Sequence, residues 1–291
     1  MSPDKEEVLG LVGVGVMGIG LLSNLIKRFQ VMIYDIDDAR LKIAIEIGGK
    51  KAESLEMLAQ CTDLIILSLP GPEQVNSVVN SLLLSGFSGT IIDTSTNDPE
   101  TSVEIFEKCS VKEVMYVASP VIGGEKGAKL GELTVIVGLP EQKGSKLDII
   151  MNLIGKNIFY VNNPRAASAI KLINNFMSIG NTLILAEALT LAQAEDIPLD
   201  LLHNVIKYGS GYSVAYERRW KNNISVDNYM PGYSISLAKK DLRLIAKITE
   251  ANGLSLIFPY LSMNALEYVA RDTSKDISWL VKVYMDLKKK G

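Results

Sequence analysis

The fold is decided by Val8-Leu9-Gly10-Leu11-Val12-Gly13-Val14-Gly15-Val16-Met17-Gly18. An apolar strand is predicted at its start, and glycines spaced G-x-G-x-x-G follow where a helix should begin. The first of these glycines permits a tight turn, the second lets the backbone approach a pyrophosphate, and the third lets helix and strand pack closely. The amino end of the helix adds amides that attract phosphate charge. The stretch therefore predicts a dinucleotide-binding turn, whose expected contacts are Gly13, Gly15, Val16, Met17 and Gly18.

A second predicted strand strengthens this interpretation, because a lone glycine pattern is weak. Val31-Met32-Ile33-Tyr34 ends at Asp35, about 20 residues downstream, where an acid is expected to accept the ribose hydroxyls. A carboxylate there would repel a 2'-phosphate, so NAD is favoured over NADP. Arg40 lies close enough in sequence to weaken that preference, and NADP stays possible. The alternative is an ordinary tight turn with Asp35 as a helix cap.

The composition is that of an ordinary globular protein. The chain has 291 residues, of which 47% are hydrophobic and 22% charged, and this is enough for two domains with filled cores. The formal net charge of -3 gives no electrostatic case for a nucleic-acid partner, and Lys288-Lys289-Lys290 is expected to be only a solvated end. No signal-peptide pattern or run of membrane-spanning length is found, so we expect no membrane partner and a cytoplasmic protein.

Cysteine and histidine usage exclude several kinds of chemistry. Cys61 and Cys109 are isolated in the sequence, which suits a reducing compartment and offers no metal-ligand spacing. His203 is the only histidine and lies in a predicted helix, near no other expected metal ligand. A multi-histidine zinc site is therefore excluded, and we predict no metal site. A catalytic acid or base must come from Lys, Asp, Glu, Tyr or Cys.

Short apolar runs alternate with helical segments up to about Tyr160, which predicts an α/β fold with a doubly wound, mostly parallel Rossmann sheet. One run, Leu64–Leu69, is almost uniformly apolar, as a central strand would be, and Pro70 follows at its carboxyl end, where ligands collect. Leu69 and Pro70 are candidate contacts to the adenosine side of the cofactor, and an ordinary strand-ending turn is the alternative. The predicted strands are 8–12, 31–34, 64–69, 90–93, 114–117, 134–137 and 157–160.

Beyond Pro164 the helical period takes over. Ala166 to Ala194 predicts one helix of about 29 residues, long enough to span about 44 Å. We expect residues 1–162 to form the dinucleotide-binding domain and residues 163–291 an all-helical domain for substrate and subunit contacts. A long helix rich in Ala and Leu often forms a subunit interface, so a homo-oligomer is expected. Further helices are predicted at 199–207, 212–222, 236–251, 258–271 and 277–289.

Lys171 and Asn175 are the candidate catalytic residues. They lie four apart in the predicted long helix, so both project from one face near its start. The neighbours of Lys171 are mostly apolar, and burial would lower its pKa. Such a lysine can pass a proton to or from a hydroxyl while a hydride moves to or from a nicotinamide, and the amide can hold the substrate or the lysine. A plain surface lysine is what the local sequence alone would favour.

Two polar loops complete the candidate site. Asp93-Thr94-Ser95-Thr96 follows a predicted strand, so its hydroxyls and amides should lie near the nicotinamide end, although a helix N-cap is the commoner use of Ser and Thr. The second loop runs from Ser119 to Ala128 and contains Gly123-Gly124. Two bare amides near Lys171 would cradle a substrate carboxylate, and a glycine-rich turn is the alternative.

Together these motifs resemble those of the beta-hydroxyacid dehydrogenase family, whose relatives include 3-hydroxyisobutyrate dehydrogenase and small semialdehyde reductases. The resemblance spans nearly the whole chain. It implies that Lys171 is the catalytic acid/base, that Asn175 is its partner at the substrate, and that Thr96 contacts the cofactor. Lys240-Asp241-Leu242, after Pro231-Gly232-Tyr233, resembles a late motif whose lysine reaches toward cofactor and substrate. The implied carboxylate binders are Ile122, Gly123 and Gly124.

The chain departs from the family pattern where the substrate should bind. Ile122 stands where a serine is usual, so a side-chain hydroxyl is missing there. Ala118-Ser119 replaces an acid and an alanine, and Asn162–Ala166 replaces a glycine-rich approach to the catalytic helix, with Arg165 as a hypothetical substitute anion contact. In the related phosphogluconate dehydrogenases the lysine is followed by His-Asn-Gly, and Asn174-Asn175-Phe176 does not match that pattern. Imine reductases usually lack the lysine.

The sequence therefore predicts an oxidoreductase that uses NAD, or possibly NADP, and interconverts a small 3-hydroxy acid with its semialdehyde or ketone. The expected partner is this small-molecule hydroxy acid or semialdehyde. Two alternatives stay open. One is an NADP-dependent reductase of a small aldehyde such as glyoxylate or succinic semialdehyde, and the other is a dinucleotide-binding scaffold that has lost catalysis.

Overall fold

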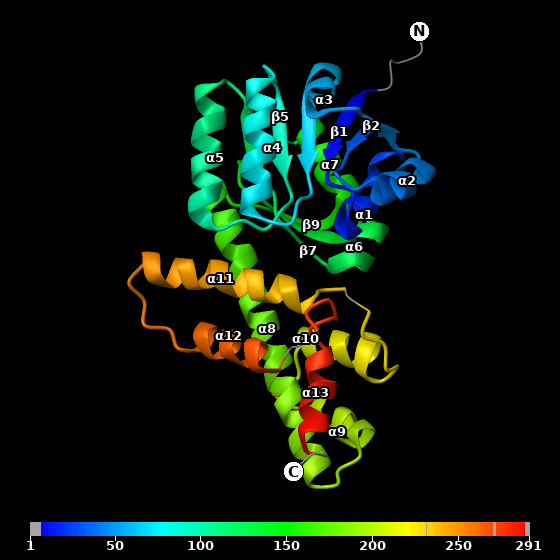
Figure 1. Cartoon of the computed structure of the whole chain (residues 1–291), viewed down its shortest axis with the longest axis vertical. Helices are drawn as coiled ribbons and strands as arrows, with labels where there is room; N and C mark the ends of the chain where they lie inside the picture. Colours follow the sequence, from blue (N-terminus) through cyan, green and yellow to red (C-terminus); the bar gives the residue numbers. More distant parts are fainter. Residues whose placement is uncertain (1–6, 142, 231, 270–271, 289–291) are drawn as a thin grey trace. The chain divides into compact units, whose positions relative to one another are not determined.

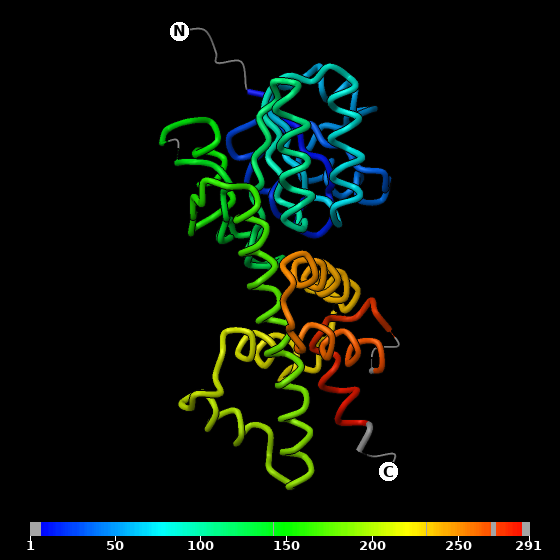
Figure 2. The backbone as a smooth tube through the Cα atoms, turned by 90° about the vertical axis from the view of Figure 1, so that its left-hand side faces the viewer, coloured from blue at the N-terminus to red at the C-terminus, as the bar shows by residue number. Residues whose placement is uncertain are grey.

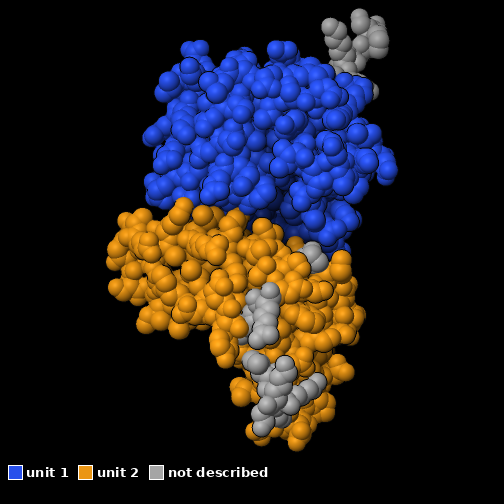
Figure 3. Space-filling model, in the orientation of Figure 1, with its two compact units in different colours: residues 1–171 blue, residues 172–291 orange. Residues whose placement is uncertain are grey.

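A computed structural model describes residues 7–141, 143–230, 232–269 and 272–288. Its contacts divide the chain into two compact units, residues 1–171 and 172–291 (Figure 3). The predicted domain boundary between residues 162 and 163 stays a prediction. Parts of several predicted features lie outside the described residues: residues 1–6, Pro231 of the late motif, residues 270–271 of one predicted helix and Lys289-Lys290 of the basic run.

Unit 1 is built on a six-stranded parallel sheet in the order β3-β2-β1-β4-β5-β6 (Figure 1). The order reverses between β1 and β4, which creates the crevice where this class of sheet binds ligands. The predicted parallel Rossmann sheet is confirmed. The strands are β1 Val8–Val12, β2 Gln30–Tyr34, β3 Lys50–Lys51, β4 Leu64–Leu67, β5 Thr90–Asp93 and β6 Met115–Ala118.

The sheet is covered on both faces because its strands alternate apolar side chains between two cores. In β4, Leu64 and Ile66 belong to one core, whereas Ile65 and Leu67 belong to the other. Each such fully buried side chain contributes about 1.5–3 kcal/mol. Helices α1, α2, α6 and α7 supply the first core, and α3, α4 and α5 the second. Their bounds are α1 Val16–Leu25, α2 Asp38–Ile47, α3 Leu55–Cys61, α4 Pro72–Leu84, α5 Pro99–Val111, α6 Gly124–Leu130 and α7 Lys146–Ile154.

The last two predicted strands form a separate sheet. It consists of β7 Val121–Ile122, β8 Leu133–Val137 and β9 Gly155–Tyr160, with β7 antiparallel and β9 parallel to β8. Pro120 lies between β6 and β7 and cannot donate a ladder hydrogen bond; instead its carbonyl accepts one from the Ile136 amide at 3.1 Å. The short strands β3 and β7 were absent from the sequence prediction, and part of the predicted loop 119–128 is therefore β7 followed by α6.

Unit 2 is helical. The long helix α8, Pro164–Ala194, has 31 residues and runs from unit 1 into unit 2. Its apolar side chains at Leu172, Ile179 and Leu183 belong to one core with residues of α11, α12 and α13. Figure 2 traces the backbone of these helices. None of the described helices is long and apolar enough to cross a membrane. The other helices are α9 Leu199–Ile206, α10 Val214–Arg219, the π-helix η1 Trp220–Ile224, α11 Ile235–Ala251, α12 Phe258–Val269 and α13 Trp279–Lys288.

Candidate active site

The three glycines of the turn after β1 do different things. Gly13 has a φ of +91°, and a Cβ on it would collide with the carbonyl oxygen of Ser68. A Cβ on Gly18 would collide with the carbonyl oxygen of Gly13, so helix α1 packs directly on the turn. The position of a Cβ on Gly15 is open, because its nearest neighbour there is Nη1 of Arg40 at 3.7 Å. Gly13 and Gly18 thus serve packing, whereas Gly15 leaves space above the turn.

Asp35 is held by the same turn. One of its carboxylate oxygens accepts a hydrogen bond from the Val14 amide at 2.8 Å, and the other accepts one from the Asp37 amide at 2.9 Å. The helix cap of α2 is Asp37, which accepts from the amides of Ala39 and Arg40. The alternative in which Asp35 caps the helix is therefore wrong. A carboxylate with two lone pairs on each oxygen keeps acceptor capacity for ribose hydroxyls.

The loop after β5 is tied to the loop after β4. The Thr94 hydroxyl donates to the carbonyl oxygen of Leu67 at 2.7 Å, and Ser95 Oγ accepts from the Leu69 amide at 2.9 Å. Neither hydroxyl caps α5, because its cap is Asp98. Of the residues 93–96, only Thr96 is partly exposed. Thr96 is thus the hydroxyl of this loop that a ligand can reach.

A buried acid that sequence reasoning did not single out supports that loop. Asp93 is 1% exposed and accepts hydrogen bonds from the Tyr116 hydroxyl (2.7 Å), the Asn97 amide group (2.7 Å) and the Ser95 backbone (2.9 Å). Burial raises the pKa of the Asp93 carboxyl, and the hydrogen bonds oppose that rise. Its position at the end of a strand before Ser and Asn was the available signal.

The predicted carboxylate loop has open backbone. Ile122 ends β7 and is partly exposed. Gly124 has a φ of +65°, and nothing lies within 4 Å of the Cβ that a side chain would add there. Gly123, with a φ of +143°, packs against the Leu133 side chain instead. The open space beside Gly124 would let a substrate carboxylate approach the backbone there, with Ile122 as an apolar neighbour in the sequence.

Lys171 and Asn175 both lie on α8, one turn apart. Lys171 is partly exposed, whereas Asn175 is only 8% exposed. The Asn175 amide nitrogen donates to Asp241 at 2.6 Å, and its oxygen accepts from the Asn174 amide at 3.2 Å. The side chain of Asn175 is therefore fixed at both ends.

Asp241 links the polar side chains around Asn175, and sequence reasoning missed this role. It is 2% exposed, and the oxygen that binds Asn175 also accepts from the Tyr233 hydroxyl at 2.6 Å. Its other oxygen lies 3.0 Å from Nζ of Lys240. Burial raises the pKa of Tyr233 well above 10, and the Asp241 charge raises it further. The tyrosine is therefore a neutral donor to the carboxylate.

Other candidates have different partners. Arg165 pairs with Glu100 at 2.6 Å, so its guanidinium already serves an acid. His203 stacks on Trp220 with ring centroids 4.5 Å apart and lies 2.9 Å from the Tyr216 hydroxyl, which is a packing role. Within the described residues no group of three His, Cys, Asp or Glu is arranged to hold a metal ion.

The predicted site residues thus form two sets, one in each unit. Unit 1 holds Gly13, Gly15, Val16, Met17, Gly18, Asp35, Leu69, Pro70, Thr96, Ile122, Gly123, Gly124 and Lys171, and unit 2 holds Asn175 and Lys240. In unit 1, the glycine turn and Asp35 lie together, as do the loops after β4 and β5. In unit 2, Asn175 and Lys240 meet at Asp241.

Comparisons with known proteins agree with this arrangement. Residues 8–162 match the model of the NAD-binding domain of 6-phosphogluconate dehydrogenase. Residues 166–284 match the model of the NAD-binding region of NADP-dependent 3-hydroxyisobutyrate dehydrogenase. Each half of the chain therefore matches a domain of a nicotinamide-dependent dehydrogenase.

Individual relatives cover most of the chain. The 2-(hydroxymethyl)glutarate dehydrogenase of Eubacterium barkeri is 31% identical over 258 residues, covering 87% of this chain and 86% of that protein. The 3-hydroxyisobutyrate dehydrogenase of Pseudomonas aeruginosa is 27% identical over 292 residues, covering 95% and 98%. Among solved structures, Mycobacterium tuberculosis 3-hydroxyisobutyrate dehydrogenase with L-serine has a TM-score of 0.84 at 22% identity, covering 95% and 98%, and shares the fold.

Proposed function

Because the chain belongs to the beta-hydroxyacid dehydrogenase family and is an NAD(P)-dependent oxidoreductase acting on CH-OH groups, we propose that it interconverts a small 3-hydroxy acid and its semialdehyde, with Lys171 as general acid/base. The observation that carries the proposal is the fixed amide of Asn175, one helical turn from Lys171 and hydrogen-bonded to a buried carboxylate at 2.6 Å. An amide held in this way is oriented before a substrate arrives.

The residues around the glycine turn fit a dinucleotide. The open position above Gly15 leaves room for the pyrophosphate, and no side chain caps the amino end of α1 among the described residues, so its first amides suit phosphate charge. Asp35 would accept hydrogen bonds from the adenosine ribose, and Leu69 and Pro70 would flank the adenosine. Thr96 and Lys240 would contact the nicotinamide end. When bound, the nicotinamide accepts or returns the hydride.

A side chain of the protein transfers the proton. In the oxidation direction, the substrate O–H bond breaks as its proton passes to neutral Nζ of Lys171, while the carbon loses its hydride and the carbonyl forms. In the reverse direction, the protonated amine returns that proton to the carbonyl oxygen. Asn175 gives one amide hydrogen to Asp241, which leaves its second for a substrate oxygen.

The substrate should carry a carboxylate. We assign it to the backbone at Gly123 and Gly124, where the Gly124 surroundings are open, with Ile122 supplying an apolar contact. Two small 3-hydroxy acids are candidate substrates. One is 3-hydroxyisobutyrate, and the other is 2-(hydroxymethyl)glutarate, which appears in the name of the relative from Eubacterium barkeri.

A second candidate function is an NADP-dependent reductase of a small aldehyde. It is favoured by Arg40, whose guanidinium lies 3.7 Å from the open position above Gly15 and 3.3 Å from Asp37. A cation there would attract a 2'-phosphate, whereas Asp35 would repel it. We propose NAD as the preferred cofactor because the Asp35 carboxylate is itself anchored to the turn.

We also propose that the protein is a cytoplasmic homo-oligomer assembled over α8. The helix leaves large apolar side chains exposed at Met177, Ile184 and Leu191, each seven residues from the next. Such a stripe suits another copy of the same helix. The isolated cysteines, one of them buried, suit a reducing compartment.

A panel of hydroxy acids tests the proposed reaction. Cofactor reduction is followed with 3-hydroxyisobutyrate, 2-(hydroxymethyl)glutarate, serine, glycerate, 3-hydroxypropionate and 4-hydroxybutyrate, with NAD and NADP in parallel. Turnover with a 3-hydroxy acid is expected. Silence with every acid, together with tight NADH binding, would contradict the proposal and favour a non-catalytic scaffold. Preference for NADP and an aldehyde would favour the second candidate.

A further inference from the structure

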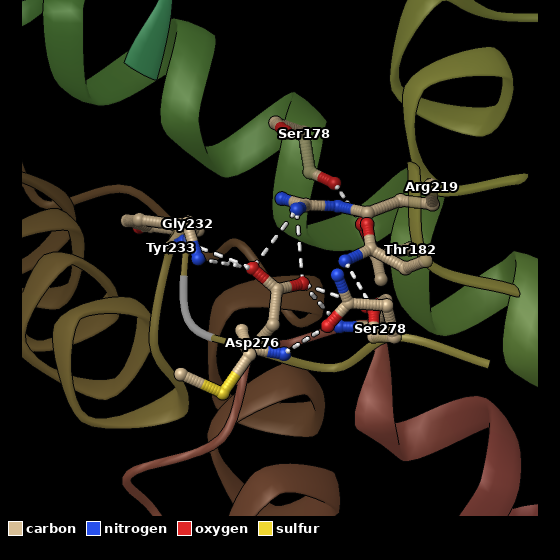
Figure 4. Close-up of polar contacts among 10 residues, drawn as sticks. Ser178, Thr182, Arg219, Gly232, Tyr233, Asp276 and Ser278 are labelled. Atoms are coloured by element: carbon tan, nitrogen blue, oxygen red, sulfur yellow. Dashed lines mark hydrogen bonds and ion pairs between the residues drawn. The ribbon is translucent and has the colours of Figure 1, made fainter. Parts of the chain in front are cut away.

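A buried carboxylate in unit 2 collects hydrogen bonds from separate segments of the chain (Figure 4). Asp276 is 1% exposed. One of its oxygens accepts from the backbone amides of Gly232 (3.1 Å) and Tyr233 (2.9 Å). The other accepts from the amide and hydroxyl of Ser278 (2.9 and 2.7 Å) and from Nη1 of Arg219 (3.0 Å). Both carboxylate oxygens of Asp276 therefore accept more than one hydrogen bond.

Arg219 supplies the compensating charge. It is the last residue of α10, its side chain is 14% exposed, and Figure 4 draws it beside Ser178 and Thr182 of α8. A buried ion pair of this kind is retained only when its remaining hydrogen-bonding groups are satisfied, and removal of one partner leaves an uncompensated charge. Asp276 is therefore strongly fixed where it stands.

The same region pairs two stretches of backbone. The Ile277 amide donates to the carbonyl oxygen of Tyr233 at 2.9 Å, and the Ile235 amide donates to that of Lys275 at 3.0 Å. Ser234 forms a bridge with Asp276 and caps α11. The position of the Tyr233 backbone is thus set by the segment around Asp276, immediately before the helix that carries Asp241.

Tyr233 connects the segment around Asp276 to the candidate active site. Its hydroxyl and the Asn175 amide nitrogen both donate to the same oxygen of Asp241, each at 2.6 Å. Two short hydrogen bonds from different directions fix the plane of a carboxylate better than one. The orientation of the Asn175 amide therefore depends on Asp241, and that of Asp241 depends on where Tyr233 stands.

We propose that Asp276 is a positioning residue for Asn175, acting through the backbone and hydroxyl of Tyr233 and the carboxylate of Asp241. The proposal rests on the proposed function of Asn175 at the substrate. All these residues lie in unit 2. Misplacement of a substrate-binding group by a fraction of an ångström slows the chemical step even when the cofactor still binds.

A double-mutant cycle tests the proposal in the full-length protein. Tyr233→Phe and Asp276→Asn are each made in the wild type and in Asn175→Ala. In the wild type, Tyr233→Phe should lower kcat about two- to tenfold, as the loss of one hydrogen bond would, and Asp276→Asn should lower it at least as much, both with unchanged NADH affinity. In the Asn175→Ala background each change should lower kcat by less than about twofold, because the residue they position is gone.

Asp272→Asn is the matched control. Asp272 is exposed and accepts hydrogen bonds from the amide and hydroxyl of Ser274, much as Asp276 accepts them from Ser278. Unlike Asp276, it is not bonded to the Tyr233 backbone among the described residues. Its substitution should leave kcat unchanged. If Tyr233→Phe and Asp276→Asn lower kcat equally in both backgrounds, or lower only the melting temperature, the positioning role is wrong.

Two further outcomes are distinct. If Asp276→Asn does not fold, Ser278→Ala takes its place in the cycle, because it removes one hydroxyl hydrogen bond to Asp276 (2.7 Å) and keeps the carboxylate. If Asn175→Ala by itself leaves kcat unchanged, the proposed function of Asn175 fails and the positioning role falls with it. That failure is recognised in the single variant, whereas failure of the positioning role alone leaves Asn175→Ala defective and the cycle additive.

Discussion

Alanine should lower stability at Gly13 and weaken NADH binding at Gly15, although the two glycines are only two residues apart in one motif. At Gly13, alanine must adopt a φ of +91° and place its Cβ against the carbonyl oxygen of Ser68. That oxygen cannot easily retreat, since the Ser68 amide is bound to the carbonyl oxygen of Val12 at 2.9 Å. The positive φ costs about 1–2 kcal/mol and the overlap about 1–3 kcal/mol.

The expected free-energy loss for Gly13→Ala is therefore about 2–5 kcal/mol. In a protein of this size class each kcal/mol lowers the melting temperature by about 2–4 °C, so the fall should be about 4–20 °C. At Gly15 the backbone has a φ of -68°, which alanine adopts freely, and the added methyl meets only Arg40. A poorer helix cap and a stiffer unfolded chain roughly offset each other, leaving a change within about 1 kcal/mol.

The methyl of Gly15→Ala would instead occupy the open space assigned to the pyrophosphate. A steric cost of about 1–3 kcal/mol in the complex corresponds to about 5- to 150-fold weaker NADH binding. The assays are thermal unfolding without ligand and titration of NADH fluorescence. The reasoning is refuted if Gly15→Ala lowers the melting temperature as much as Gly13→Ala does, or if it binds NADH as tightly as the wild type.

Three further changes should have defined outcomes. Arg40→Ala should weaken NADPH binding relative to NADH by about two- to fivefold, as expected for a half-exposed cation, and equal losses for both cofactors would argue against a 2'-phosphate contact. Burial raises the pKa of the Asp93 carboxyl above its ordinary value of 3.8, so its contribution to stability is complete below that ordinary value and is lost as pH rises through the raised pKa. The unfolding free energy of the wild type minus that of Asp93→Asn should accordingly fall from low to neutral pH in denaturant titrations, and a rise would contradict the assignment. Ile184→Glu should shift sedimentation toward a monomer, whereas the exposed Ile43→Glu on α2 should not; a wild type that is already monomeric would rule out the oligomer.

Local patterns explain why much of unit 1 was predictable. The glycine spacing requires one particular backbone, and the alternation of short apolar runs with helices indicates parallel strands. Thus β1 and β5 were predicted to the residue. Strands β3 and β7 have two residues each, too short for any periodicity to register. Strand propensity also does not encode that β8 and β9 pair with β7 in a sheet of their own.

The site was less predictable because its polar contacts are remote in sequence. Asn175 and Asp241 are 66 residues apart, and Asp276 is 43 residues from Tyr233. Thr94 and Ser95 look like ligand-binding or capping hydroxyls, yet they bond to residues 26 or 27 positions away. Lys171 and Asn175 were singled out because a helix brings residues four apart to one face, whereas the tertiary packing that makes Asp241 the partner of Asn175 has no local signature.

The central claim is tested most directly by the proton-transfer residue. With the best substrate of the panel and saturating cofactor, the rate of cofactor reduction is measured for Lys171→Ala and, as a control, for Lys247→Ala, an exposed lysine on α11. The account predicts a fall of about 10²- to 10⁴-fold for Lys171→Ala, unchanged NADH affinity, and a normal rate for the control. A Lys171→Ala enzyme that reduces cofactor at nearly the wild-type rate would contradict it.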